Sequence, residues 1–380
     1  MNRKLFLAAL VLLMGLTPRA WAYDFSAECP SGQTLYYNIV DGEAQVTYES
    51  YSSATDYYQN YTLCPVGDLA IPSTVTYEET TYSVTSIGGA AFYGCSVLTS
   101  VSIPNSITSI GNSAFNDCSG LTSITLPNSI TEFGVYAFKN CSNLTAVHYT
   151  GNISDWCGIR FGNGYSNPVC YARKLYINNT LLTDLVIPDG ITEINNFSFI
   201  NNKFLRSVSL PNTVKYIGWS GFALDSALTT FTLPESIDSL GPWALWGCAG
   251  LRSIRACNPV PPAVGSDSTF ARIDKTIPVY VPRGSKARYV SAPGWSQFTN
   301  FVESDMNVRD NPLKPFGDIT IASRDGAIYI DGEATEPVSV YDISGRMIYQ
   351  GRVKSPVRVP TSGIYLVKVG DTHAQKVLVR

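Results

Sequence analysis

The sequence predicts a mainly β protein built as a solenoid of repeated coils. A 23-residue pattern recurs along the chain: residues 84–106 read VTSIGGAAFYGCSVLTSVSIPNS, and residues 107–129 read ITSIGNSAFNDCSGLTSITLPNS. The composition also favours strands and turns, with 30 Gly, 23 Tyr and 22 Pro. One copy of such a unit cannot bury its own apolar side, whereas a stack of copies can.

Seven consecutive units cover residues 84–259. Six are 23 residues long and begin at Val84, Ile107, Ile130, Ile191, Val214 and Ile237. The other unit, residues 153–190, carries an insertion of 15 residues. The first place of the unit is always Val or Ile, the ninth is Phe except for Leu245, and the fifteenth is Leu. Columns that are always apolar face the core, where each side chain contributes about 1.5–3 kcal/mol.

Each unit predicts its own strand and turns. LTSITL (Leu121–Leu126) has apolar residues at relative places 1, 4 and 6, the pattern of a leucine-rich repeat. Its second half alternates as a strand does, and a Pro follows the strand in most units. The fifth place is Gly in five units and Asn195 in one. Because Gly and Asn tolerate positive φ, we expect a tight bend there.

The stretch SIGNSAFNDCSGLTSITLP resembles the 23-residue repeat of BspA-like bacterial surface proteins. The resemblance covers residues 84–259, insertion included. The chain departs from it at Asn202 and Asp225, which stand where Cys is usual, and at Leu245, which stands where Phe is usual. The resemblance implies a leucine-rich repeat solenoid that acts in adhesion to host matrix proteins and in contacts between bacteria.

Residues 1–22 read as a secretory signal peptide. Arg3 and Lys4 precede an apolar run, and AWA ends the segment with small residues where a signal peptidase cleaves. Residues 23–83 are expected to form an N-terminal β cap and residues 260–305 a C-terminal cap, because a solenoid must cover its apolar ends.

The C-terminal part changes character. Residues 306–315 read as a linker, and residues 316–380 alternate apolar and polar residues between Gly turns, which predicts a small antiparallel β-sandwich. YDISGRMIYQG, SGIYLVKV and KVLVR resemble the sorting domain of the type IX secretion system of Gram-negative bacteria. The resemblance implies export across the outer membrane by that machinery; the alternative is an ordinary β module.

The nine cysteines leave at least one thiol without a partner in the chain. Cys95, Cys118 and Cys141 share the twelfth place, and we expect them to be buried thiols. Two disulfides are possible, Cys29 with Cys64 and Cys157 with Cys170.

Motifs for catalysis, metal or cofactor binding are not found. The two histidines, His148 and His373, lie in different predicted domains, and no Cys/His spacing suits zinc. The net charge of −3 with 15% charged residues shows no basic face for a nucleic acid. No segment after the signal peptide is apolar enough to span a membrane. We therefore predict a protein that is not an enzyme and carries no cofactor or metal.

The outward places of the strands are the predicted binding surface, together with aromatic residues of the insertion. The candidate residues are Ser100, Ser102, Ser123, Thr125, His148, Trp156, Tyr165, Ser207, Ser209, Thr230, Thr232 and Arg255. Trp219, Trp243 and Trp246 are further possible anchors. The predicted function is a secreted or cell-surface adhesin of a Gram-negative bacterium. Its expected partners are host extracellular matrix proteins or glycans, or another bacterial surface component. Two alternatives stay open: a glycan-capture protein beside degradative enzymes, and a hydrolase with an unrecognised site.

Overall fold

The computed structural model divides the chain into two compact units, Met1–Asp305 and Met306–Arg380. The described residues are 20–21, 23–51, 64–304, 320–324, 326–331, 338–342, 346–351, 356–361, 363–369 and 373–379. The predicted linker and most of the predicted signal peptide lie outside these residues. Of the signal peptide only β1 (Ala20–Trp21) is described, paired with β5 (Ser50–Tyr51).

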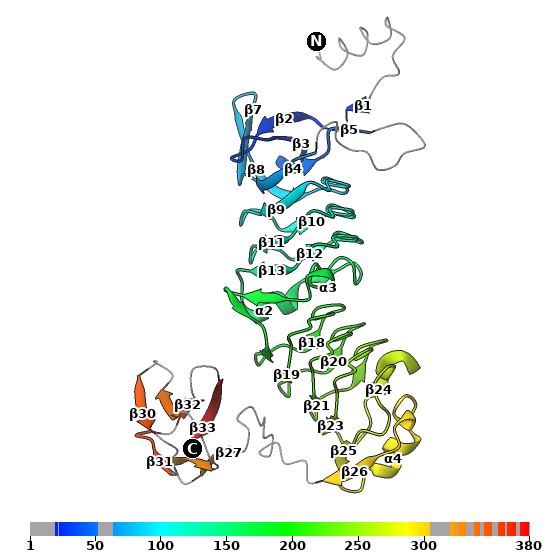
Figure 1. The fold of residues 1–380 in the computed structure, drawn as a ribbon, viewed down its shortest axis with the longest axis vertical. Coiled ribbons are helices and arrows are strands. Elements are labelled where there is room, and N and C mark those ends of the chain that lie inside the picture. Colours follow the sequence, from blue (N-terminus) through cyan, green and yellow to red (C-terminus); the bar gives the residue numbers. More distant parts are fainter. Residues whose placement is uncertain are drawn as a thin grey trace, which may run out of the picture. The chain divides into compact units, whose positions relative to one another are not determined.

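The first unit is a solenoid whose coils stack along the vertical direction of Figure 1. A regular coil contributes one longer strand and one short strand, and each kind stacks into its own sheet. In the first half the longer strands form one sheet in the order β16 (Thr180–Leu181), β15 (Leu175–Ile177), β13 (Ala146–Tyr149), β11 (Ser123–Leu126), β9 (Leu98–Ser102) and β6 (Gly67–Ala70).

The short strands of the first half extend an N-terminal sheet. It runs in the order β14 (Arg160–Phe161), β12 (Glu132–Phe133), β10 (Ser109–Ile110), β8 (Thr80–Ile87), β4 (Glu43–Thr47), β3 (Thr34–Val40) and β2 (Phe25–Glu28), with β7 (Thr74–Tyr77) paired to β8. The strands β2, β3 and β4 are antiparallel, and β4 then joins β8 in parallel.

The second half of the solenoid repeats the arrangement in separate sheets. Its longer strands form the pair β17 (Asp184–Val186) and β19 (Ser207–Ser209), and the sheet β21 (Thr230–Leu233), β23 (Ser253–Ala256), β25 (Val279–Pro282) and β26 (Phe301–Ser304). Its short strands are β18 (Glu193–Ile194), β20 (Tyr216–Ile217), β22 (Ser239–Leu240) and β24 (Ala263–Val264).

Strand pairing confirms the 23-residue period. Ser123 of β11 pairs in parallel with Ser100 of β9 on one side and with Ala146 of β13 on the other. The apolar columns form the core: Phe92, Phe115 and Phe138 are fully buried, with ring centroids 5.1 and 5.2 Å apart along the stack. Buried, offset rings of this kind contribute beyond their apolar area. The prediction that Phe161 continues this ninth-place column is wrong, because Phe161 pairs with Phe133, the fourth place of the preceding unit.

The structural reason for glycine at the fifth place differs from the predicted one. Positive φ falls at the seventh and eleventh places instead, for example at Ser113 (54°) and Asp117 (62°). Gly111 is needed for space, since a Cβ there would lie 2.6 Å from the backbone nitrogen of Gly89 on the preceding coil. The expected left-handed bend at this place is therefore wrong, and close packing of successive coils explains the glycine.

The insertion supplies helices between the two halves. They are α2 (Ile153–Gly158) and α3 (Val169–Ala172). Asn195 takes the glycine place next to α2, and its amide donates to the carbonyls of Cys157 and Ile159 at 2.9 and 3.1 Å. These carbonyls at the end of a helix lack partners within it, which explains an amide where other coils have glycine.

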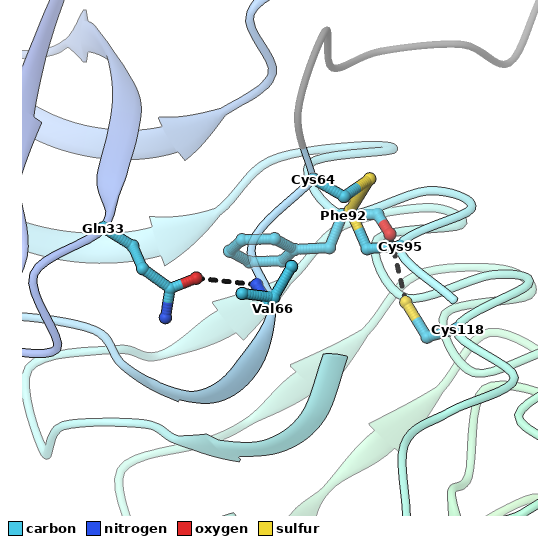
Figure 2. The surroundings of a disulfide bond; sticks show 6 residues. All are labelled: Gln33, Cys64, Val66, Phe92, Cys95 and Cys118. Atoms are coloured by element: carbon cyan, nitrogen blue, oxygen red, sulfur yellow. Dashed lines mark hydrogen bonds between the residues drawn. A yellow bond between two sulfur atoms is a disulfide. The ribbon is translucent and has the colours of Figure 1, made fainter. Parts of the chain in front are cut away.

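Figure 2 shows a disulfide that the sequence analysis did not predict, between Cys64 and Cys95. Their Cα atoms lie 5.3 Å apart, so the segment before β6 is joined to the first coil. Beside it the Cys118 thiol donates to the Phe92 carbonyl at 3.0 Å, and the Gln33 side chain accepts from the Val66 amide at 2.7 Å. The pairs Cys29–Cys64 and Cys157–Cys170 are wrong, because Cys29, Cys157 and Cys170 are free thiols. Cys118 and Cys141 are buried free thiols as expected, whereas Cys95 is buried but forms a disulfide.

Residues after the last regular coil belong to the same core. They form η1 (Asp267–Phe270), α4 (Lys286–Ser291) and η2 (Trp295–Gln297). Tyr289, Trp295 and Phe298 are buried, and the first two donate to the carbonyls of Asn258 at 2.6 Å and Pro262 at 2.9 Å.

The second unit has two antiparallel sheets. One contains β27 (Thr320–Arg324), β28 (Ala327–Asp331) and β31 (Val357–Arg358). The other has the order β30 (Met347–Gly351), β29 (Val338–Asp342), β32 (Gly363–Val369) and β33 (His373–Val379). Ile328 of the first sheet and Val340 and Val367 of the second lie in one buried cluster.

Candidate binding surface on the repeat strands

The outward face of the first sheet consists of register-matched rows of side chains. Strand pairing places one row in the order Asp68, Ser100, Ser123 and Ala146. The neighbouring row runs Ala70, Ser102, Thr125, His148 and Tyr176. The second row therefore changes from small side chains to two rings as it approaches the insertion.

A polar pocket lies where the side chains of this row change from small to large. It has a volume of about 310 Å³ and is lined by Ser123, Thr125, His148, Tyr149, Thr150, Asn178 and Asn179. Three of the predicted binding residues, Ser123, Thr125 and His148, are thus brought together. None of the lining residues carries a carboxylate, an ammonium or a guanidinium group.

A stacked pair of rings forms one side of the pocket, and a tight turn forms another. The His148 ring stacks on Tyr176 of β15, with centroids 4.6 Å apart and planes 15° from parallel. Asn178 and Asn179 form the two-residue turn between β15 and β16, with φ of 47° and 64°. Two positive φ angles are typical of a type I′ hairpin turn. The backbone N–H of Asn178 donates to the Tyr149 carbonyl at 2.9 Å, which fixes the turn to β13.

The other strand-face candidates lie outside the pocket. Ser207 and Ser209 are half-buried on β19, while Thr230 and Thr232 lie on β21 of a different sheet. The Arg255 guanidinium lies 5.5 Å from the centre of the Tyr280 ring on β25, a cation–π contact. Ser100 and Ser102 lie on β9, in the same sheet as the pocket.

Each half of the solenoid starts its hydroxyl row with an aspartate. Asp68 accepts hydrogen bonds from Ser100 at 2.6 Å and Thr99 at 3.1 Å, and these bonds, first that from Ser100, lower the pKa of the Asp68 carboxyl. In the second half Asp184 accepts from Ser207. The two segments share the pattern Asp-Leu-x-Ile-Pro at residues 68–72 and 184–188, a signal in the sequence that was missed.

The aromatic candidates separate into buried and exposed ones. Trp156 is fully buried, and its indole donates to the Ser198 carbonyl at 2.9 Å, so its prediction as a binding residue is wrong. This side chain joins the insertion to the next coil. Tyr165 is 47% exposed but packs beside Tyr136 and Tyr171, away from the strand face. Trp219 and Trp243 are exposed neighbours, with ring centroids 5.5 Å apart, whereas Trp246 is half-buried under Arg272.

Asn178, Asn179, Tyr149 and Thr150 line the pocket but were not predicted as site residues. The Asn-Asn pair between two short apolar runs could have indicated a type I′ hairpin. The position of this turn beside β13 depends on how the insertion packs. The repeat pattern gives no information about that packing. Burial, helped by the nearby Asp155, raises the pKa of the Tyr149 hydroxyl above its usual range.

The described residues contain no group of three or more His, Cys, Asp and Glu side chains that could hold a metal ion. In the same part of the chain, no helix has the length and apolar character needed to cross a bilayer.

Solved leucine-rich repeat proteins are similar to this chain. A cell-surface protein of Faecalibacterium prausnitzii is 25% identical over 61% of this chain, with a TM-score of 0.42. A leucine-rich repeat protein of T. pallidum is 22% identical over 62% of this chain and 91% of its own length, with a TM-score of 0.36. The pneumococcal vaccine antigen PcpA is 13% identical over 74% of this chain and 99% of its own, with a TM-score of 0.31. The chain spans only 55% of the F. prausnitzii protein. No curated protein matches it.

A family model gives the firmest assignment. The BspA-type leucine-rich repeat region matches in six copies over residues 71–163 and 172–272, just over half of the chain. The interval between the two matched segments falls in the insertion, where we counted a seventh unit from the apolar columns. With its 23-residue period confirmed by strand pairing, the chain belongs to the BspA-type leucine-rich repeat family.

Proposed function

We propose that the protein is an exported binding protein or adhesin that presents the outward face of its repeat strands to a partner on another surface. The observation that carries the proposal is the register of that face. In the first half, β6, β9, β11 and β13 align their outward side chains into continuous rows, and the central members of both rows are serines and threonine. Such a face offers area rather than a reactive group, which suits binding through many weak contacts.

The partner is proposed to be a host extracellular matrix protein or glycan, or a component of another bacterial surface. The support is family membership and the small hydroxyl side chains of the face. Hydrolysis is less well supported. A glycosidase needs two carboxylates across one cleft, and the pocket beside His148 is lined by none.

Export and attachment belong to the same proposal. We propose that residues 1–22 direct secretion and that residues 316–380 form a β-sandwich read by a type IX secretion system, which places the protein outside a Gram-negative cell. The shared buried cluster of the two C-terminal sheets supports the sandwich.

We also propose that residues 23–83 and 260–305 act as caps, since Phe25 and Trp295 belong to the core of the solenoid.

The test is a binding array of matrix proteins and glycans, probed with purified chain beginning at residue 23 and at several salt concentrations. Saturable binding to a matrix protein supports the adhesin, and binding confined to glycans supports the capture of glycans beside degradative enzymes. Turnover of a glycan or peptide that survives further purification would contradict the proposal.

A further inference from the structure

The pocket beside His148 differs from the rest of the strand face because it is concave and bounded by three separate segments. Ser123 and Thr125 come from β11, His148 to Thr150 from β13 and the residue after it, and Asn178 and Asn179 from the turn of the insertion. Its volume of about 310 Å³ is at the lower end for small-molecule sites. The pocket therefore suits one small ring-sized group rather than a protein segment.

The chemistry of the lining residues restricts the class of ligand that can bind in the pocket. Serine and threonine hydroxyls and asparagine side-chain amides offer both donors and acceptors, and the imidazole adds two ring nitrogens that can form hydrogen bonds. A neutral sugar also carries several hydroxyl groups that donate and accept at once, so the two sets match. An anion would need a concentration of donors with positive charge, and a cation would need carboxylates. The lining offers neither.

The geometry is held in place before any ligand arrives. Stacking against Tyr176 at 4.6 Å restricts the His148 ring. The backbone N–H of Asn178 donates to the Tyr149 carbonyl of β13, and the backbone N–H of Thr150 donates to the Leu126 carbonyl at 3.1 Å. Groups held in this way lose less conformational entropy when a ligand binds.

We propose that this pocket binds one neutral saccharide unit of a glycan, with His148, Thr125 and Asn179 as contacts. The inference rests on the proposed binding function and names a ligand class for one part of the face. An isolated monosaccharide is expected to bind with a Kd on the order of 1 mM, because one ring buries little area and its contacts are polar. Longer glycans would gain further contacts along the rows of Ser102 and Ser100.

The experiment is saturation-transfer NMR on the purified chain with glucose, galactose, mannose, fucose and N-acetylglucosamine, and with N-acetylneuraminate as a charged comparison. Asn179→Gly removes one side-chain amide and converts the turn to the Asn-Gly pair that type I′ turns favour. Thr125→Val removes one hydroxyl from an exposed strand position. Thr232→Val on β21 is the matched control outside the pocket.

The proposal expects at least one neutral sugar to bind, each pocket variant to weaken binding about five- to tenfold, and the control to leave it unchanged. The proposal would be overturned if no neutral sugar binds, if N-acetylneuraminate is preferred, or if both pocket variants bind with the affinity of the native chain. If binding to a matrix protein persists in any of these cases, only the saccharide inference fails. If the chain also binds no matrix protein and no glycan on the array, the proposed function fails for both of these partner classes as well.

Discussion

The two halves of the solenoid share their apolar columns but differ at one buried place and on their outward faces. At the twelfth place, residues 84–152 have three cysteines, whereas the coils from 191 to 259 have Asn202, Asp225 and Cys248. The first half has one sheet of longer strands with a pocket at its end, and the second half divides its longer strands between two sheets. The comparison teaches that the apolar columns determine the coil, while departures from the repeat change the buried polar groups and form the pocket.

The buried twelfth place shows the difference in chemical detail. The thiols of Cys118, Cys141 and Cys248 each donate to a Phe carbonyl 26 residues earlier, at 3.0 to 3.1 Å. Asp225 is fully buried and accepts from the Asn202 backbone amide at 2.7 Å, but its second oxygen has no hydrogen-bond partner among the described residues. Burial raises the pKa of the Asp225 carboxyl well above its usual range.

The largest effect is expected where both halves agree, in the phenylalanine column. Phe115→Ala removes a ring that stacks on Phe92 and Phe138. It should cost about 3–5 kcal/mol of unfolding free energy, since the rigid coils cannot collapse into the cavity. Denaturant unfolding measures this loss, and Ser142→Ala at an exposed turn is the control. A cost below about 1 kcal/mol, the range of many conservative exposed changes, would show that the column does not stabilise the stack.

The next effect belongs to the first half alone, at its disulfide. Cys64→Ser should lower stability by about 2–4 kcal/mol, because the cross-link restricts the unfolded chain. Denaturant midpoints with and without reductant should then be equal in the variant and different in the native chain. The control is Cys257→Ser, a free thiol in the second half. A native chain whose midpoint does not respond to reductant would contradict the role of the Cys64–Cys95 bond.

A smaller effect is expected at Asp225 in the second half. Its raised pKa means that the folded state binds the proton more tightly than the unfolded state. Stability should therefore fall as pH rises from about 3.9, the ordinary Asp value, through the folded pKa. Asp225→Cys restores the thiol of the other coils and should add about 1–3 kcal/mol at neutral pH by removing an unsatisfied buried group.

The measurement is denaturant unfolding of the native chain and Asp225→Cys between pH 4 and pH 8. The difference in stability between them should grow with pH. Asp238→Asn, at an exposed position of the same half, is the matched control for removing a carboxylate. A constant difference for Asp225→Cys would mean that Asp225 is ionised in the folded state throughout this range.

The sequence predicted those features that repeat. The period, the buried Phe and Leu columns and the outward serines and threonines all follow from the alternation within one unit. Features that depend on packing between coils were not accessible. The need for Gly111 comes from an atom of the preceding coil, and the Cys64–Cys95 bond comes from the path of a non-repeating segment.

The pocket combines both kinds of information. Ser123, Thr125 and His148 could be named from the strand pattern, and that they bind a ligand stays a prediction. Asn178 and Asn179 reach them only because β15 of the insertion pairs with β13 and then turns back. Trp156 was misassigned because an aromatic residue in an insertion has the same sequence signal whether it is exposed or, as here, buried.

The central claim, that the strand face of the first half is the binding surface, is tested most directly by placing charge on each face in turn. Thr125→Glu would place a charge in the first half and Thr232→Glu the equivalent charge in the second half. Binding of each purified variant to the partner found on the array is then compared with the native chain. The account predicts a loss of at least about tenfold, or about 1.4 kcal/mol, for Thr125→Glu and little change for Thr232→Glu. The reverse order, or full binding by Thr125→Glu with its fold intact, would contradict it.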